Sequence, residues 1–146
     1  MSIAERTAST VWTGSLAAGE GVVNGATGAL ADLPVTWVAR TEHPGGKTSP
    51  EELAAAAHSS CYSMALALSL GQHRFTPEKL DVSATVTLDE VDGVPTIVTS
   101  VLTVEATVPD VDDATFQSIV DEASKLCPIS RLFAGASITV NATLSS

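Results

Sequence analysis

The sequence predicts one α+β domain over residues 1–146, in which antiparallel sheets pack on a long central helix. The apolar run from Ser49 to Gly71 is long enough for that helix. β-Branched stretches with alternating apolar and polar residues lie before and after it, and a second, amphipathic helix is expected after Asp112. Strands that are grouped rather than alternating regularly with helices indicate the α+β class.

The central helix has clear signals at both ends. Ser49 is expected to cap it, Pro50 suits its first position, and Glu52 stands where a carboxylate can reach back to the N–H of the cap. Gly71 suits the turn after its last residue. No charged residue follows Glu52 until Arg74, and leucine, methionine and alanine fall on every face. We therefore expect this helix to be buried all round.

The segment before the helix is predicted to form a small antiparallel meander. Its β-branched residues alternate with small and polar ones, and glycines separate the runs. We expect strands at 7–13, 22–23 and 35–40, turns at 14, 19–21 and 24–25, and a loop at 42–47.

The segment after the helix is predicted to form a hairpin, a second helix and a closing strand. Residues 80–88 alternate apolar and polar side chains, and an Asp-Gly turn at 92–93 leads into the run 96–108. Asp112 is expected to cap the second helix, Cys127 to end it and to cap a further helical turn from Pro128, and residues 136–144 to form the last strand. The predicted buried face of the second helix comprises Phe116, Ile119, Val120, Ala123 and Leu126.

Composition and charge exclude several functional classes. With 45% hydrophobic residues, 146 residues suffice for one domain with its own core. The formal net charge of −10 and the lack of a Lys/Arg cluster argue against nucleic acid or an anionic membrane as partner. The first residues lack the apolar core of a signal peptide, so we expect a cytoplasmic location. The central helix carries a histidine, serines and a tyrosine and barely reaches spanning length, which favours a core helix over a membrane span.

The two cysteines are the candidate reactive groups. In a reducing compartment a permanent disulfide is not expected, so each thiol either fills space or takes part in chemistry. A reactive thiolate needs a cation or a helix N-terminus beside it. Cys61 lies inside the predicted helix and would need an arginine from elsewhere, whereas Cys127, as a cap, would lie near unsatisfied N–H groups. The candidate arginines are Arg40, Arg74 and Arg131.

Two other arrangements of these side chains are less well supported. His58 and Cys61 share a helix face at i and i+3, as a base and a nucleophile would, but no third orienting group is evident. A metal site drawn from His43, His58, Cys61 and Cys127 lacks the Cys-x-x-Cys or paired-histidine spacing of such sites. We therefore expect His58 to be a packing residue and expect no metal.

Two motifs carry a family resemblance. The first is Ser-Pro-Glu-Glu-Leu-Ala-Ala-Ala-Ala-His-Ser-Ser-Cys-Tyr-Ser-Met-Ala-Leu-Ala-Leu, from Ser49 to Leu68, and the second is Leu-Cys-Pro-Ile-Ser, from Leu126 to Ser130. Together they resemble the OsmC/Ohr family of thiol peroxidases, and its OsmC branch in particular, over nearly the whole chain. The resemblance implies reduction of organic hydroperoxides, and of hydrogen peroxide, by two cysteines without a metal or bound cofactor.

The resemblance also implies roles for four residues. Cys61 matches the peroxidatic cysteine, and Cys127 matches the resolving cysteine that closes a disulfide with it. Arg40 matches the arginine that stabilises the thiolate and aligns the peroxide, and Glu51 matches the carboxylate that holds this arginine. Glu52 is already assigned to the predicted capping box, which agrees with giving Glu51 this role.

Partners and assembly follow from the same resemblance. An external dithiol must reduce the disulfide, and the family suggests lipoylated proteins or thioredoxin-like donors. The family forms an intertwined homodimer, which would cover an all-round apolar helix. Glu51 and Cys61 are about 15 Å apart along a straight helix, so either the helix bends or the Arg40–Glu51 pair comes from a second subunit. The alternative is a non-enzymatic ligand-binding or structural stress protein on the same fold.

Overall fold

The computed structural model describes residues 1–145 and confirms the α+β class. The chain divides into two units, Met1–Pro50 and Glu51–Ser146, which are described separately. That they act as one domain stays a prediction. The first unit contains β1 (Ala8–Thr13), β2 (Glu20–Gly25), β3 (Leu33–Val35) and α1 (Trp37–Thr41). The second contains α2 (Pro50–Gln72), whose first residue closes the first unit, with β4 (Lys79–Val91), β5 (Val94–Thr107), α3 (Asp113–Leu126), α4 (Pro128–Leu132) and β6 (Ser137–Ser145).

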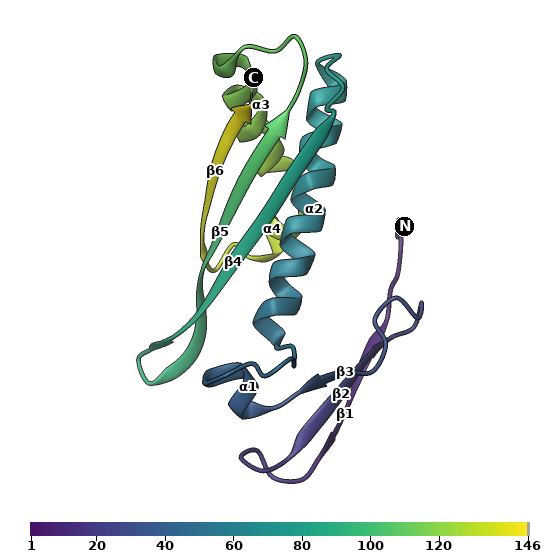
Figure 1. The fold of residues 1–146 in the computed structure, drawn as a ribbon, viewed down its shortest axis with the longest axis vertical. Helices are drawn as coiled ribbons and strands as arrows, with labels where there is room; N and C mark the ends of the chain where they lie inside the picture. Colours follow the sequence, from purple (N-terminus) through teal and green to yellow (C-terminus); the bar gives the residue numbers. More distant parts are fainter. Residues whose placement is uncertain (146) are drawn as a thin grey trace. The chain divides into compact units, whose positions relative to one another are not determined.

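The first unit is built on the predicted antiparallel meander, with strand order β1-β2-β3 (Figure 1). β2 is longer than expected, because the predicted turn residues Glu20-Gly21 and Asn24-Gly25 pair with β1 instead. A side chain at Gly21 would come within 2.8 Å of Val35 and 2.9 Å of Trp12 on the two neighbouring strands. Glycine here therefore makes room for the neighbours of a strand and does not mark a turn.

The predicted strand over residues 35–40 is wrong beyond its first residue. Val35 belongs to β3, but residues 37–41 form α1. The Thr36 hydroxyl accepts a hydrogen bond from the Ala39 N–H at 3.0 Å, and the Thr41 hydroxyl donates to the Trp37 carbonyl at 2.8 Å. An N-cap at Thr36 thus outweighs the strand preference of the residues that follow it.

The second unit contains a three-stranded sheet in the order β4-β5-β6. The predicted hairpin is confirmed, and Asp92 (φ 52°) and Gly93 (φ 78°) form its turn in the left-handed conformation that short hairpin loops need. The expectation of purely antiparallel sheets is wrong for β6, which pairs parallel to β5. The two strands are joined through α3 and α4. This crossover returns the chain to the end of the sheet at which β5 begins, as parallel pairing requires.

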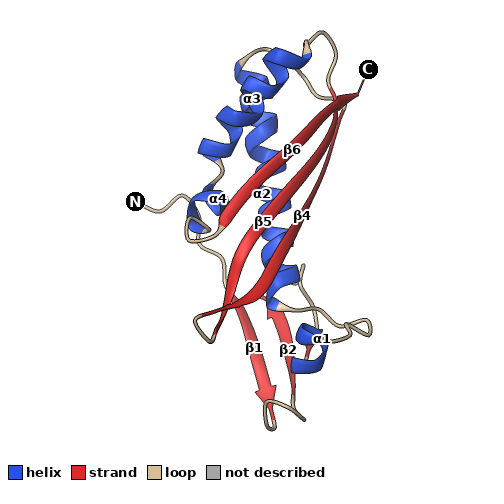
Figure 2. Ribbon diagram, turned by 90° about the vertical axis from the view of Figure 1, so that its left-hand side faces the viewer, coloured by secondary structure: helices blue, strands red, loops and turns tan. Residues whose placement is uncertain are grey.

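The helices of the second unit lie on one side of its sheet (Figure 2). On α2 the buried residues Tyr62, Leu66 and Leu70 follow one helical face and share a core with alternate residues of β5. The opposite face exposes Met64 (71%) and Leu68 (56%). The prediction of all-round burial is therefore wrong for a single chain, although α2 keeps the length and apolar composition of a possible membrane span. Its packed face contributes to the hydrophobic core of the second unit.

The predicted second helix is α3, and its cap is confirmed. The Asp112 carboxylate accepts a hydrogen bond from the Thr115 N–H at 2.7 Å, which lowers the pKa of Asp112. Four of the five residues predicted for its apolar face are buried, whereas Leu126 is 44% exposed. The further turn from Pro128 is confirmed as α4, with Cys127 between the two helices as cap.

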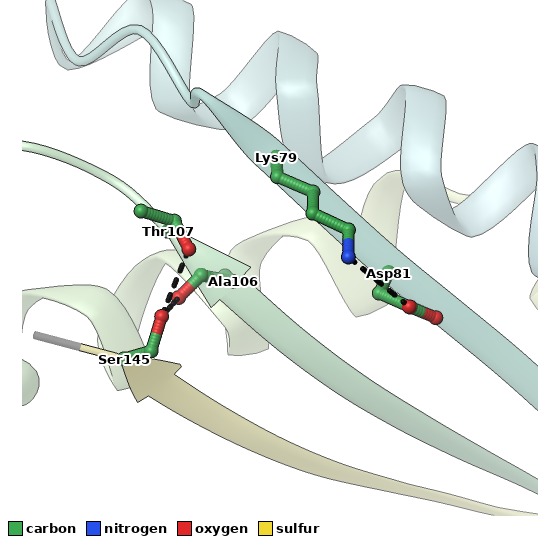
Figure 3. Close-up of polar contacts among 5 residues, drawn as sticks. All are labelled: Lys79, Asp81, Ala106, Thr107 and Ser145. Atoms are coloured by element: carbon green, nitrogen blue, oxygen red, sulfur yellow. Dashed lines mark hydrogen bonds and ion pairs between the residues drawn. The ribbon is translucent and has the colours of Figure 1, made fainter.

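A small hydrogen-bond network joins the ends of β5 and β6, as Figure 3 shows. The Ser145 hydroxyl lies 2.8 Å from that of Thr107 and donates to the Ala106 carbonyl at 3.0 Å. On β4, Lys79 and Asp81 form an exposed ion pair of 3.7 Å. The Ser145 contacts therefore link the ends of β5 and β6, whereas the exposed pair within β4 contributes little.

Candidate active site

Two cysteines that are far apart in the sequence interact in the second unit. Cys61 lies in the middle of α2 and is partly exposed, whereas Cys127 lies between α3 and α4 and is fully buried. Both are free thiols, and the Cys127 side chain is near enough to Cys61 to raise the pKa of the Cys61 thiol. The two cysteines that the family resemblance paired are therefore neighbours within one chain, and their disulfide stays a prediction.

The first turn of α4 contacts both sulfur atoms. Cys127 has an extended backbone, and its Sγ accepts a hydrogen bond from the Ser130 N–H at 3.5 Å. The backbone N–H of Ile129 is near enough to Cys61 to lower the pKa of its thiol. Pro128 begins α4 and has no N–H of its own. The N–H groups of the next two residues have no partner within the helix, so they are available to the thiols.

The role of Ile129 was missed in the sequence analysis. A cysteine within a long helix lies far from the ends of that helix, so the sequence indicated an arginine as the stabiliser of Cys61. The structure adds a backbone donor from a different helix. The signal for it was the Cys-Pro pair, which starts a helix whose N–H groups need acceptors.

Burial determines the protonation state of Cys61. Burial raises the pKa of its thiol, and the neighbouring Cys127 raises it further, while the Ile129 N–H lowers it; the net direction is upward. At neutral pH the groups of the second unit therefore favour the thiol over the thiolate. A cation must approach Cys61 before it can act as a nucleophile.

His58 is buried completely and is engaged at both ring nitrogens. Nδ1 lies 2.6 Å from the Ser100 hydroxyl on β5, and Nε2 lies 2.8 Å from the Ser130 hydroxyl on α4. The ring of Phe133 meets it edge-on at 5.3 Å. Burial lowers the pKa of His58, so the ring is neutral at pH 7. With both nitrogens bound to serines, His58 is not placed as a base for Cys61.

The predicted arginine and carboxylate lie in different units. Arg40 is in α1, where its guanidinium carbon lies 5.8 Å from the centroid of the Trp37 ring. Glu51 is in the first turn of α2 and is 9% exposed. Their pairing, and the approach of Arg40 to Cys61, stay predictions because the two units are described separately. The other candidates, Arg74 and Arg131, are exposed.

Among the described residues, those considered for a metal site form no group that could hold a metal ion. His43 lies in a loop of the first unit, and His58 is bound to two serines. Among residues 1–145, no group of three or more histidine, cysteine, aspartate or glutamate side chains is arranged to hold a metal ion.

Comparison with known proteins relates this arrangement to a family. The model of the OsmC-like protein family matches residues 43–143. Peroxiredoxin OsmC of Escherichia coli is 41% identical over 135 residues, which cover 92% of this chain and 93% of that protein. A protein of Mycoplasma pneumoniae described as organic hydroperoxide resistance protein-like is 33% identical over 114 residues, or 77% of this chain and 78% of that protein.

Solved structures agree on the fold. The OsmC like protein from Mycoplasma pneumoniae matches with a TM-score of 0.76 at 18% identity, covering 99% of this chain and 100% of that chain. The organic hydroperoxide resistance protein OhrB of Bacillus subtilis matches with a TM-score of 0.68 at 25% identity, covering 95% and 98%. From the family model and the extended sequence identity, the chain belongs to the OsmC-like family, as its helix and Cys-Pro motifs predicted.

Proposed function

We propose that this protein is a two-cysteine thiol peroxidase that reduces organic hydroperoxides and hydrogen peroxide, with Cys61 as the peroxidatic and Cys127 as the resolving cysteine. Relatives named Peroxiredoxin OsmC and organic hydroperoxide resistance protein support the activity and the substrate class. The observation that carries the residue assignment is that the two free thiols are neighbours within one unit. Cys61 is the partly exposed member of the pair, so it is the one a substrate can reach.

The first step forms a sulfenic acid on Cys61. The thiolate attacks the distal oxygen of the hydroperoxide, a sulfur–oxygen bond forms, and the oxygen–oxygen bond breaks. The leaving alkoxide takes a proton and departs as an alcohol. Because the pKa of Cys61 is raised by burial, this step depends on a cation that stabilises the thiolate.

The second step joins the two cysteines. The Cys127 thiolate attacks the sulfur of the Cys61 sulfenic acid, a disulfide bond forms, and the sulfur–oxygen bond breaks. Hydroxide leaves and becomes water with the proton given up by Cys127. An external dithiol then reduces the disulfide, and we propose a lipoylated or thioredoxin-like protein as its source.

Arg40 and Glu51 are the proposed cation and its anchor. Arginine keeps its charge and offers paired donors to a thiolate and a peroxide oxygen at once. Glu51 is almost fully buried, and a buried carboxylate is normally paired with a cation. The pair acts either within its own chain or on the pocket of a second subunit.

Assembly and location complete the proposal. The exposed apolar face of α2 supports an intertwined homodimer, in which a second copy covers Met64 and Leu68. Two unbridged cysteines fit a reducing compartment and support a cytoplasmic location.

Mass spectrometry of the reduced protein before and after one equivalent of an alkyl hydroperoxide tests the function. We expect the wild type to lose two hydrogen atoms, with Cys61 and Cys127 in one cross-linked peptide. The Cys127→Ser variant should stop at a sulfenic or further oxidised Cys61. A chelator should leave both results unchanged.

Two outcomes would contradict the assignment. Full dithiol-dependent turnover in Cys61→Ser would show that another residue is the nucleophile. Wild-type protein whose thiols are untouched by hydroperoxide would favour a non-enzymatic ligand-binding or structural stress protein on the same fold.

A further inference from the structure

His58 is a fully buried titratable residue that the proposed mechanism does not use. It lies on α2, three residues before Cys61, and its ring connects β5 to α4 through Ser100 and Ser130. A neutral imidazole has one donor and one acceptor nitrogen, and a serine hydroxyl satisfies either, so both contacts hold in either tautomer. The helix that carries Cys61 is thereby connected to the turn that follows Cys127.

This connection matters because α4 has little else to hold it. None of its five residues is buried, and Leu132 is 73% exposed. Only Ile129 packs partly against the core. A helix without a buried apolar face depends on polar contacts for its position, and the His58–Ser130 hydrogen bond of 2.8 Å is such a contact.

Ser130 is also in direct contact with Cys127. Its side chain binds His58, while its backbone N–H donates to the Cys127 sulfur at 3.5 Å. The position of the His58 ring therefore fixes a residue that in turn orients the resolving sulfur.

We infer that His58 is a positioning residue of the resolving step: through Ser130 it holds the α4 turn so that the Cys127 sulfur meets Cys61. The inference rests on the proposed two-cysteine function. It concerns the attack of the Cys127 thiolate on the Cys61 sulfenic acid, in which the disulfide forms and hydroxide leaves. His58 exchanges no proton with either cysteine in this role.

Disulfide closure is the step most sensitive to such positioning. Two sulfur atoms must approach to about 2 Å with a torsion angle near 90°, which a displaced turn cannot provide. Of the residues of α4, Ile129 is the one that affects the pKa of the Cys61 thiol, on which attack on the peroxide depends. Loss of the His58–Ser130 contact should therefore slow closure more than attack.

Two amide variants of His58 separate its two contacts. The terminal amide of glutamine reaches about as far as the imidazole Nε2, toward Ser130, whereas that of asparagine reaches only as far as Nδ1, toward Ser100. His58→Gln thus keeps the contact to α4, and His58→Asn loses it. Ser130→Ala removes the same contact from the other side and leaves the N–H to Cys127 in place.

Stopped-flow kinetics with one equivalent of an alkyl hydroperoxide can resolve the two steps. Trapping of the sulfenic acid measures the attack of Cys61 on the peroxide, and loss of both thiols measures closure of the disulfide. In His58→Asn and Ser130→Ala we expect closure to slow about tenfold or more and attack to change by less than about threefold, the scale of one buried hydrogen bond. His58→Gln should close at nearly the wild-type rate. Unchanged closure in Ser130→Ala, or equal loss of both steps, would overturn the inference.

Oxidation by diamide keeps this test distinct from that of the proposed function. Diamide oxidises neighbouring thiols to a disulfide without any peroxide, so it reports on the approach of Cys127 to Cys61 alone. If hydroperoxide fails with the wild type but diamide closure is slow in His58→Asn and normal in His58→Gln, the proposed function fails and the resolving role fails with it, whereas the positioning of Cys127 by His58 stands. If diamide closes all variants equally, the inference fails whatever hydroperoxide does. If Ser130→Ala does not fold, the comparison of His58→Asn with His58→Gln still tests the inference.

Discussion

At the scale of single residues, the reactivity of Cys61 is set by opposing effects on one sulfur. Burial and the neighbouring Cys127 raise the pKa of its thiol, and the Ile129 N–H lowers it by less. One backbone donor is therefore not enough to give a thiolate at neutral pH. For Cys61 to react as a thiolate, a positive charge from outside these groups would have to supply the difference.

Arg40 is the proposed source of that charge, so Arg40→Ala should lower peroxidase kcat/KM by on the order of 10² to 10³, as loss of one transition-state charge stabiliser commonly does. Glu51→Ala should cost less, because the arginine remains present. Arg40→Lys is the matched control, which keeps the charge and loses the paired donors. Titration of the Cys61 thiolate checks the cause: an unchanged thiol pKa in Arg40→Ala would direct attention to Arg74 or Arg131.

His58 should make folding stability depend on pH. Burial lowers its pKa in the folded state below the ordinary value of 6.5, so below that pH the unfolded chain binds more protons than the folded chain. The free energy of unfolding should fall as pH falls from 6.5 through the lowered pKa, and His58 should contribute no slope above 6.5. Urea unfolding of wild type and His58→Gln checks this. Parallel stability curves between about pH 7 and 5 would contradict it.

At the scale of elements, α3 makes two polar contacts of similar length in different surroundings, one with α2 and one with His73 in the turn that follows α2. The Tyr62 hydroxyl donates to the Val120 carbonyl at 2.9 Å inside the core, and burial raises the pKa of Tyr62 to about 12, so it stays a donor. His73 and Glu122 form a 2.8 Å pair whose side chains are 45% and 42% exposed. Only the first is shielded from competing water.

Tyr62→Phe should therefore lower the free energy of unfolding by about 1 kcal/mol, the net value of one buried hydrogen bond. The change keeps the ring and its packing, so the loss reports on the hydroxyl. His73→Gln should change stability by less than about 0.5 kcal/mol, because an exposed ion pair contributes little. Urea unfolding of the reduced protein measures both, and an equal loss in the two variants would show that burial does not distinguish them.

At the scale of the whole molecule, the exposed face of α2 requires an explanation. Met64 and Leu68 are large apolar side chains with most of their surface in water, while the opposite face of the same helix forms the core. Such a face is unfavourable on a monomer and suits a self-complementary contact about a two-fold axis. The core of the chain would then bury one face of α2, and the contact between two chains would bury the opposite face.

We expect light scattering to show a homodimer at micromolar concentration, and Leu68→Glu to shift it to monomer or make it insoluble. Thr85→Glu is the matched control, since it adds the same charge on the exposed face of β4. Ala67→Glu should behave like Leu68→Glu, whereas Ala65→Glu should prevent folding because Ala65 is buried within its own chain. A monomeric wild type would contradict the dimer.

Mixed refolding of Cys61→Ser and Arg40→Ala subunits tests whether a pocket is shared. If Arg40 acts on the partner's Cys61, a mixed dimer regains one intact pocket, and activity should recover to about a quarter of wild type in a statistical mixture. Each variant refolded alone is the control and should remain inactive. No recovery in the mixture would place Arg40 and Cys61 of one chain in the same pocket.

The sequence by itself determined the helices with strong end signals, the long hairpin and the two cysteine motifs. Local rules act there: Asp112 caps α3, Asp92-Gly93 turns β4 into β5, and Cys127 before Pro128 starts α4. The family followed because its motifs are continuous stretches of the chain. In contrast, residues 37–40 were predicted as part of a strand from their strand preference, and the cap at Thr36, which starts α1, was not predicted.

Tertiary structure alone decided which distant groups meet. The parallel pairing of β6 depends on the path of α3 and α4, and the single buried face of α2 depends on which side the sheet covers. The Ile129 N–H on Cys61 and the two serines on His58 come from segments far along the chain. Periodicity describes one element at a time, so it indicates that a side chain is apolar or polar, but only packing selects its partner and thereby the pKa of a buried thiol or imidazole.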